Sequence, residues 1–255
     1  MQMPTLPLAS RIRIGLLLAA VLVAPVDAVA QWPPERFSNL QVLPQDISLG
    51  ELVATMRGFA SALGVRCNHC HVGTDPDDLA TFQFPSDEKY TKRKARTMLR
   101  MVKAINETHL ASLEVRASPP IEVTCATCHH GLPLPRGLHE ILMAKVRTEG
   151  AAAALEEYTA LRAEHYGSYS YDFSNYLLSS VAEEIADTDR AGAIELLTAN
   201  VELFPEFMFN HYALGELHQT AGDSTSAIAH FREALVLDPG NRWVIGKLEG
   251  LGAGP

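Results

Sequence analysis

The sequence predicts a mainly α-helical protein organised in separate parts, and three observations carry this prediction. Apolar residues recur at helical spacing in several stretches. The balance of charge changes sharply near residue 148, and two residue types recur 34 positions apart in the last third of the chain. Such a recurrence is typical of stacked helix pairs. We therefore expect a targeting segment at residues 1–30, a first helical domain at 31–147 and a helical repeat domain at 148–255.

The first 30 residues have the composition of a cleavable secretory signal peptide. Arg11 and Arg13 precede an apolar run at residues 14–23. Ala28 and Ala30 then provide the small residues of a cleavage site. The run is too short for a typical membrane span, and an uncleaved anchor is the alternative. We expect export and no membrane span in the mature chain.

Charge is unevenly distributed along the expected mature chain. Residues 31–147 contain 14 Lys and Arg against 12 Asp and Glu, a net charge of plus two. Residues 148–255 contain 5 against 17, a net charge of minus twelve. This asymmetry indicates two parts with different surfaces, although solubility alone also accounts for an acidic surface. Nucleic acid is not an expected partner of an exported protein with an acidic half.

The first helix is predicted after a polar lead-in arm at residues 31–44. Ser48 and Glu51 have the spacing of a capping box, and Gly64 is a helix stop. The apolar residues between them recur at helical spacing and are Leu49, Leu52, Val53, Met56, Phe59, Ala60 and Leu63. A helix is therefore expected from residue 49 to 63, shortly before the first cysteine.

All four cysteines of the chain fall in two short motifs of the form C-x-x-C-H. The residues of the two motifs are Cys67, Cys70, His71, Cys125, Cys128 and His129. This pattern is typical of covalent c-type haem attachment, in which the thiols bond to the porphyrin and the His is an axial iron ligand. The sequence therefore predicts two covalently bound c-type haems.

Other chemistry for the cysteines explains less of the pattern. Four thiolates suit one structural zinc ion, and two disulfides or a thioredoxin-like redox pair suit an exported chain. None of these requires a His directly after both second cysteines, and the gap between the pairs is long for a zinc ribbon. Haem is the expected cofactor, with zinc and disulfides as the alternatives.

Met56 is the expected second axial ligand of the first haem. It lies in the middle of the predicted apolar face, and the turn at Gly64 could fold it back over a haem attached at Cys67. A thioether is a soft ligand suited to iron, and Met/His ligation raises the reduction potential. The alternative is that Met56 fills core space, a common role of methionine.

A second amphipathic helix is predicted from about residue 91 to 106. Its polar face is strongly basic and is expected either to neutralise haem propionates, to meet an acidic partner or to be solvated. Its apolar face carries Met98 and Met101 one turn apart, and His109 follows. Periodicity alone does not select among these three residues as a ligand of the second haem.

Two segments closely resemble the cytochrome subunit of photosynthetic reaction centres. The first is the basic helix, which reads Y-T-K-R at residues 90–93 and R-T-M-L-R-M-V at 96–102, and the second is residues 123–131 around the second C-x-x-C-H motif. The resemblance extends over about residues 39–136. In that family a Met on the preceding helix is the sixth iron ligand. The resemblance therefore implies Met56 for the first haem and Met98 for the second, with Met101 as the fallback.

The chain also differs from the photosynthetic members of that family, which usually carry four haems. It has two motifs and then an unrelated acidic segment. The resemblance therefore implies a two-haem periplasmic relative of the subunit.

The acidic segment is predicted to form helical repeats. An alanine-rich helix is expected at residues 148–165 and a closing helix at 241–251. Between them Ala193 and Pro205 recur 34 residues later as Ala227 and Pro239, the period of tetratricopeptide repeats. Such repeats usually bind another protein on a concave surface, and an acidic cap on the first domain is the alternative.

Together these features predict a periplasmic electron carrier, a dihaem cytochrome c that exchanges single electrons with redox protein partners such as a membrane electron-transfer complex. No catalytic residues are expected. The enzymatic alternative, a dihaem peroxidase, requires one open iron with a distal acid or base, and the sequence has no evident pair of this kind. A third possibility is an interaction module in which the haems act partly as structural staples.

Overall fold

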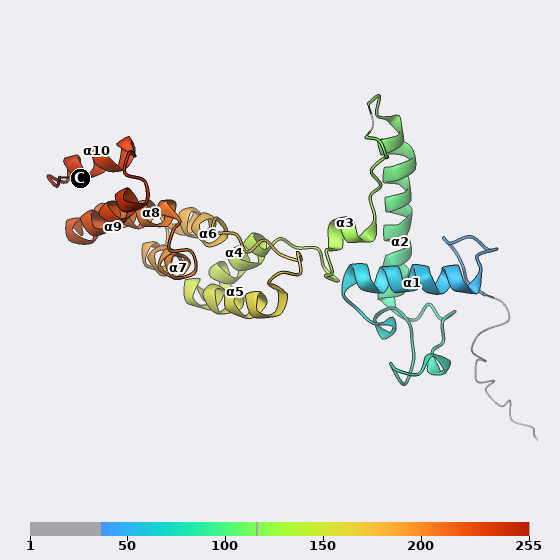
Figure 1. Cartoon of the computed structure of the whole chain (residues 1–255). Helices are drawn as coiled ribbons and strands as arrows, with labels where there is room; N and C mark the ends of the chain where they lie inside the picture. Colours follow the sequence, from blue (N-terminus) through green and yellow to red (C-terminus); the bar gives the residue numbers. More distant parts are fainter. Residues whose placement is uncertain (1–36, 116, 255) are drawn as a thin grey trace, which may run out of the picture.

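The computed structural model describes residues 37–115 and 117–254, so the predicted signal peptide lies outside the described residues. The described chain is mainly α-helical, as predicted, and its helices form two groups that are joined by an extended segment after α3 (Figure 1). No helix in the described part of the chain is long and apolar enough to cross a membrane.

The first helix, α1 (Leu49–Leu63), has the bounds that the sequence predicted. Ser48 and Glu51 form the capping box, with the Glu51 amide donating to Ser48 Oγ at 3.3 Å and the Ser48 amide donating to Glu51 Oε2 at 3.0 Å. Gly64 ends the helix in the left-handed conformation, with φ at 63°. This is a conformation that glycine adopts without the steric cost of a β-carbon.

A compact loop follows α1 and contains the short 3₁₀ helices η1 (Cys67–His69) and η2 (Leu79–Thr81). The loop closes on itself through a single antiparallel bridge between Val72 and Gln83. Phe82 is buried inside it, and a β-carbon on Gly73 would stand only 2.8 Å from the Phe82 ring. The loop therefore folds around one aromatic ring.

The second long helix, α2 (Tyr90–Ala104), runs crosswise to α1 (Figure 1). The sequence predicted a helix at 91–106, and the α-helical pattern ends at Ala104, where the chain widens into a π-turn, η3 (Ile105–His109). After η4 (Leu110–Ser112) the chain returns to form the short helix α3 (Cys125–His129).

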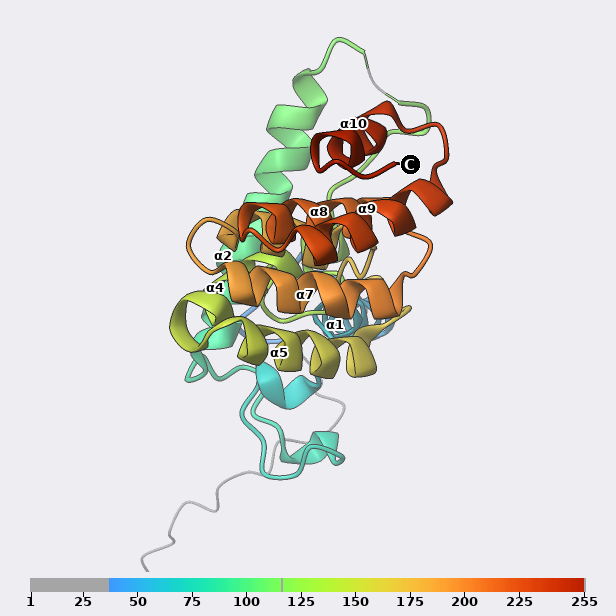
Figure 2. The same cartoon turned by 90° about the vertical axis from the view of Figure 1, so that its left-hand side faces the viewer.

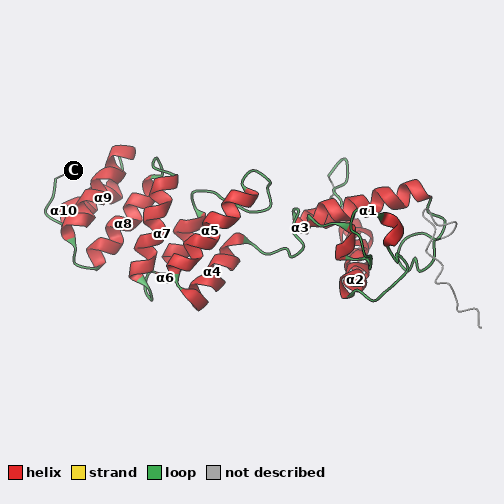
Figure 3. Ribbon diagram, turned by 90° about the horizontal axis from the view of Figure 1, so that it is seen from below, coloured by secondary structure: helices red, strands yellow, loops and turns green. Residues whose placement is uncertain are grey.

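The remaining helices pack as antiparallel neighbours in one elongated stack (Figures 2 and 3). They are α4 (Leu138–Glu149), α5 (Ala151–His165), α6 (Leu177–Ile185), α7 (Arg190–Leu203), α8 (Met208–Thr220), α9 (Ser224–Leu237) and α10 (Arg242–Gly250). The last of these confirms the predicted closing helix. Packing of α5 on α7 and of α7 on α8 makes the helix pairs continuous with one another.

The start of the stack differs from the sequence prediction. The helix expected at residues 148–165 begins at Ala151, because Gly150 adopts a φ of 94° that interrupts the helix. Thr148 and Glu149 belong instead to α4, a helix that was not predicted. Since Leu138 and Leu142 of α4 join the same core as the later helices, α4 packs as part of the stack.

The buried apolar side chains are concentrated in the stack. One cluster joins α4 through α8 and includes Leu142, Tyr158, Leu178 and Leu196, all nearly inaccessible to solvent. A second cluster, centred on Phe231, joins α9 and α10. In contrast, neither α1 nor α2 contains a buried residue.

Candidate haem-binding sites

The first C-x-x-C-H motif is a tight turn directly after α1. The amides of Cys70 and His71 both donate to the carbonyl of Cys67, at 3.2 and 3.0 Å, so the three functional residues lie on one turn. Both cysteines are free thiols. The local backbone thus places two thiols and an imidazole on one turn, as covalent haem attachment requires.

The imidazole of His71 lies in an aromatic environment. Its ring meets the edge of Phe84 at a centroid distance of 5.0 Å, and Phe84 stacks on Phe82 at 5.4 Å. Burial, reinforced by the positive charge of Lys92, lowers the pKa of His71 to about 4. The ring is therefore neutral at physiological pH, which is the form that binds a metal ion. Among the described residues, none forms a well-aligned hydrogen bond with its buried Nδ1 atom.

Residues at the start of α2 donate hydrogen bonds to the backbone of the first motif. The Lys89 ammonium donates to the carbonyl of Asn68, and the Thr91 hydroxyl donates to the carbonyl of His69. Burial raises the pKa of the Cys70 thiol, and the Thr91 side chain partly opposes this shift. The loop between the two cysteines is thus fixed to the second helix.

The second motif forms α3, and its histidine is oriented by the backbone. Nδ1 of His129 lies 2.7 Å from the carbonyl oxygen of Leu132. Because a carbonyl only accepts, this contact places the proton on Nδ1 and leaves Nε2 as the free lone pair. A histidine ligand oriented in this way is typical of metal and haem sites.

Asn106 anchors the approach to the second motif. It lies in the π-turn after α2, and its side-chain amide brackets Val123, two residues before Cys125. Nδ2 donates to the Val123 carbonyl at 2.8 Å, and Oδ1 accepts from the Val123 amide at 2.9 Å. The sequence placed Asn106 at the end of the basic helix but did not reveal this contact, because its partner is 17 residues away across an irregular connection.

The second motif also contacts the end of α1. The amide of Gly131 donates to the carbonyl of Ala62 at 2.9 Å, and a β-carbon on Gly64 would overlap the carbonyl oxygen of Gly131. Both glycines have positive φ, at 63° and 81°. The first motif follows the C-terminal end of α1, and the residues after the second motif contact that same end. This contact joins residues too far apart in sequence for spacing to reveal.

The expected methionine ligands lie on the two long helices. Met56 is half-buried on α1, and Met98 is half-buried on α2. Met101 is more accessible, with 48% of its surface exposed, and His109 is exposed at the end of the π-turn. The absence of buried residues from α1 and α2 fits a large apolar group as the missing part of their packing.

The basic face of α2 is partly used within the molecule. Asp87 pairs with Lys92 at 3.1 Å and with Arg96 at 2.8 Å, and Gln41 donates to the same carboxylate at 3.3 Å. Arg96 also donates to the carbonyl of Asn39. One side of the basic helix therefore fastens the lead-in arm and the first loop to α2.

The alternative zinc site requires convergence of the four thiols. Within residues 37–115 and 117–254, no group of three or more His, Cys, Asp and Glu side chains is arranged to hold a metal ion. All four cysteines lie in these ranges and are free. In this part of the chain the four thiols therefore do not converge on one metal-binding site.

Comparison with known proteins identifies the family. Residues 18–196, which span both motifs and extend into α7, match the family described as photosynthetic reaction centre cytochrome C subunit. The chain belongs to this family. It is therefore a c-type cytochrome, a class whose haem is attached covalently to the chain.

Two relatives within the cytochromes match a shorter region. The chain is 35% identical over 112 residues to the photosynthetic reaction center cytochrome c subunit of Thermochromatium tepidum, covering 43% of this chain and 24% of the relative. It is 34% identical over 106 residues to cytochrome c-554 of Chloroflexus aurantiacus, covering 41% and 22%. The chain thus spans about a quarter of the length of these relatives.

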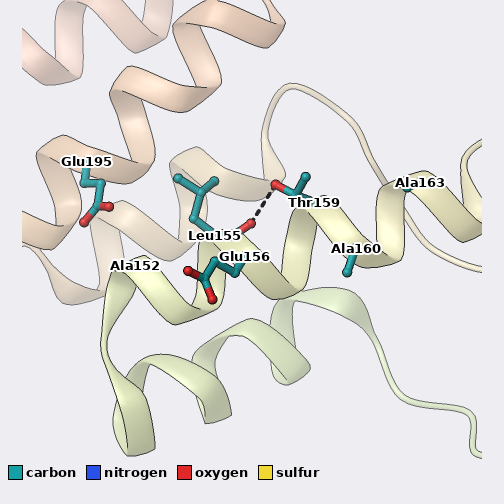
Figure 4. Close-up of a pocket in the computed structure, with 7 residues that line it drawn as sticks. All are labelled: Ala152, Leu155, Glu156, Thr159, Ala160, Ala163 and Glu195. Atoms are coloured by element: carbon teal, nitrogen blue, oxygen red, sulfur yellow. Dashed lines mark hydrogen bonds between the residues drawn. The ribbon is translucent and has the colours of Figure 1, made fainter.

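The helical stack carries a separate surface feature. A shallow hollow of about 500 Å³ lies between α5 and α7 (Figure 4). It is lined mainly by small and apolar side chains together with two carboxylates: Ala152, Leu155, Glu156, Thr159, Ala160, Ala163 and Glu195. The hollow is open to solvent and lies on the acidic part of the chain.

Proposed function

We propose that the chain is an exported dihaem cytochrome c that transfers single electrons between redox proteins. The observation that carries this proposal is the pair of C-x-x-C-H turns, each with two free thiols and a histidine prepared as a ligand. The location of both motifs at the C-terminal end of α1 supports electron exchange between two haems. Haem iron supplies the one-electron chemistry, and the chain holds it in place and sets its environment.

In this proposal each motif and one long helix hold one haem. Cys67 and Cys70 attach the first, with His71 and Met56 as axial ligands. Cys125 and Cys128 attach the second, with His129 and Met98 as axial ligands and Met101 as the fallback for Met98. Two thioether ligands close both irons to substrate, which favours electron transfer over peroxidase chemistry.

The same proposal assigns the first 30 residues to a cleaved signal peptide and the mature protein to the periplasm. It assigns residues 148–255, which form most of the helical stack, to tetratricopeptide-like repeats that dock a redox partner, such as a membrane complex. The stacked helix pairs and the 34-residue recurrence support a docking role. The acidic composition favours a partner with a basic surface.

The test is a haem count on the mature protein from a haem-maturing host. Pyridine haemochrome analysis and intact mass should give two haems, and replacing both cysteines of either motif by alanine should remove one. Met56→Ala and Met98→Ala should each remove the Met-to-iron charge-transfer band of one haem. A high-spin five-coordinate iron in the wild type would contradict closed sites and favour the peroxidase. A haem-free protein would exclude the assignment.

A further inference from the structure

Three histidines cluster on the α8–α9 helix pair, far along the chain from both haem motifs. Nδ1 of His211 on α8 lies 3.4 Å from Nδ1 of His230 on α9. The ring of His218, two turns further along α8, stacks on His230 at a centroid distance of 5.5 Å and an interplanar angle of 12°. All three rings are half-buried. Three imidazoles therefore line one seam between two helices.

Two of the three histidines, His211 and His218, stand where a tetratricopeptide pattern has aromatic residues. The pattern W-x₂-L-G-x₂-Y followed by A-x₃-F aligns with Leu214 and Gly215 on α8 and with Ala227 and Phe231 on α9. The Trp position is then His211 and the Tyr position is His218. The small and apolar packing residues of the pattern are kept, whereas its Trp and Tyr positions are His. This change points to a function beyond packing.

The distance between the two nitrogens fits a long hydrogen bond and also fits two neighbouring ligands of a shared metal ion. An N–H···O hydrogen bond has a separation of about 2.7–3.2 Å, and the 3.4 Å between these two nitrogens lies beyond that range. Zinc–nitrogen bonds of about 2.0–2.1 Å in a tetrahedral site place two ligating nitrogens roughly 3.3–3.4 Å apart. The helix pair thus holds two imidazoles at the spacing of adjacent ligands.

The surroundings of the pair also suit a cation. Glu233, one turn after His230 on α9, is exposed, and its charge acts on both His211 and His230. His218 stacks on the His230 ring, and its own Nδ1 lies 3.5 Å from a carboxylate oxygen of Asp223. These contacts restrain the His230 ring and leave negative charge beside the seam.

We propose that His211 and His230 bind a divalent transition-metal ion of the zinc, nickel and copper class, with His218 positioning His230. Imidazole nitrogen is a preferred ligand of these ions. Among the described residues no group of three or more ligands surrounds a metal, so water completes the coordination of this two-histidine site. A bound ion would join α8 to α9, independently of haem, and stabilise the last helix pair.

The experiment uses the full mature protein with its haem content measured beforehand, and Co(II) and Zn(II) as probes. We expect one equivalent of Co(II) to bind saturably in a calorimetric titration, and Zn(II) to displace it and raise the melting temperature of the stack. His211→Phe and His230→Phe keep an aromatic ring at each position and should each weaken binding at least tenfold. His139→Phe, on α4, is the matched control and should bind as the wild type does.

Three results would overturn the proposed metal site. Absence of saturable binding by the folded wild type would overturn the proposal, as would equal binding by the wild type and both variants. Loss in only one of the two variants would also overturn it, because the site requires both imidazoles. Circular dichroism without metal establishes that each variant is folded. None of these outcomes depends on how many haems the protein carries.

Discussion

At the scale of single residues, the molecule separates the groups that perform chemistry from the groups that place them. The cysteines and histidines of the two motifs are evident from sequence because attachment chemistry fixes their spacing. The groups that orient these residues are not evident from sequence. They are the Leu132 carbonyl, Asn106 and the Gly64–Gly131 contact, which come together only in the folded backbone. Sequence spacing therefore predicts candidate ligands better than the contacts that orient them.

Gly64 should tolerate no side chain. Gly64→Ala places a β-carbon at positive φ and against the Gly131 carbonyl, so we expect the free energy of unfolding to fall by about 1–3 kcal/mol. Denaturant unfolding of the haem-loaded protein measures this change. Gly50→Ala is the control, since nothing lies within 4 Å of its β-carbon position and it lies within α1. Equal effects of the two substitutions would contradict the close approach.

Asn106→Ala should loosen the second motif selectively. The change leaves both backbone groups of Val123 without their partner, at a cost of about 1–3 kcal/mol. We expect reduced haem attachment at Cys125 and Cys128 with normal attachment at the first motif, measured by peptide mass spectrometry after digestion. The exposed Gln83, changed to alanine, provides the comparison. Equal loss of haem from both motifs would argue against a local role.

At the scale of elements, the described helices follow local sequence signals where these are complete. The Ser48–Glu51 box and Gly64 defined α1 at both ends, and the amphipathic pattern located α2 to within two residues. The prediction failed at α4 and α5, where one helix was expected in place of two. The φ of 94° at Gly150 divides an otherwise helical run, and glycine in a helical pattern does not by itself reveal such a break.

Asp87 and its partners Gln41, Lys92 and Arg96 join the lead-in arm, the first loop and α2. The stability of this part of the chain should therefore fall in acid. Hydrogen bonds from Arg96, then from Asn39 and Lys92, hold the pKa of Asp87 well below its usual range. A depressed carboxyl pKa stabilises the fold above the unfolded-state value of about 3.9, and this contribution disappears as the pH falls further.

Melting temperatures of the wild type and Asp87→Asn measure this contribution. We expect the difference between the two proteins to be largest above about pH 5 and to shrink steadily below about pH 4. Glu88→Gln removes a neighbouring exposed carboxylate and should follow the wild type. A difference that stayed constant from pH 3 to 7 would show that the charge of Asp87 is not responsible.

At the scale of the whole molecule, a hydrogen bond joins the two groups of helices. The Ser170 hydroxyl, in the loop after α5, donates to the carbonyl of His130 at 2.8 Å. His130 directly follows the proposed ligand His129 and adopts a left-handed φ of 49°. The stack thus touches the backbone of the second motif, although these segments are 40 residues apart.

Ser170→Ala should alter the second haem and spare the first. Removing the hydroxyl frees the turn that carries the His129 contact, so we expect a shift in one of two reduction potentials in a spectroelectrochemical titration. Ser180→Ala, whose hydroxyl bonds only within its own helix, is the control. Identical titrations of the wild type and Ser170→Ala would show that the contact does not reach the ligand.

The uneven distribution of buried side chains has a consequence for how the protein matures. The stack has its own apolar clusters, whereas α1 and α2 have no buried residue and rely on the proposed haems for packing. In the proposed maturation after export, the stack should therefore fold unaided, while the first part stays open to the enzymes that attach haem. Limited proteolysis of protein from cells lacking those enzymes should cut within residues 37–137 and leave a resistant fragment that begins near Leu138. Equal resistance of both parts would mean that the first part folds before its cofactors arrive.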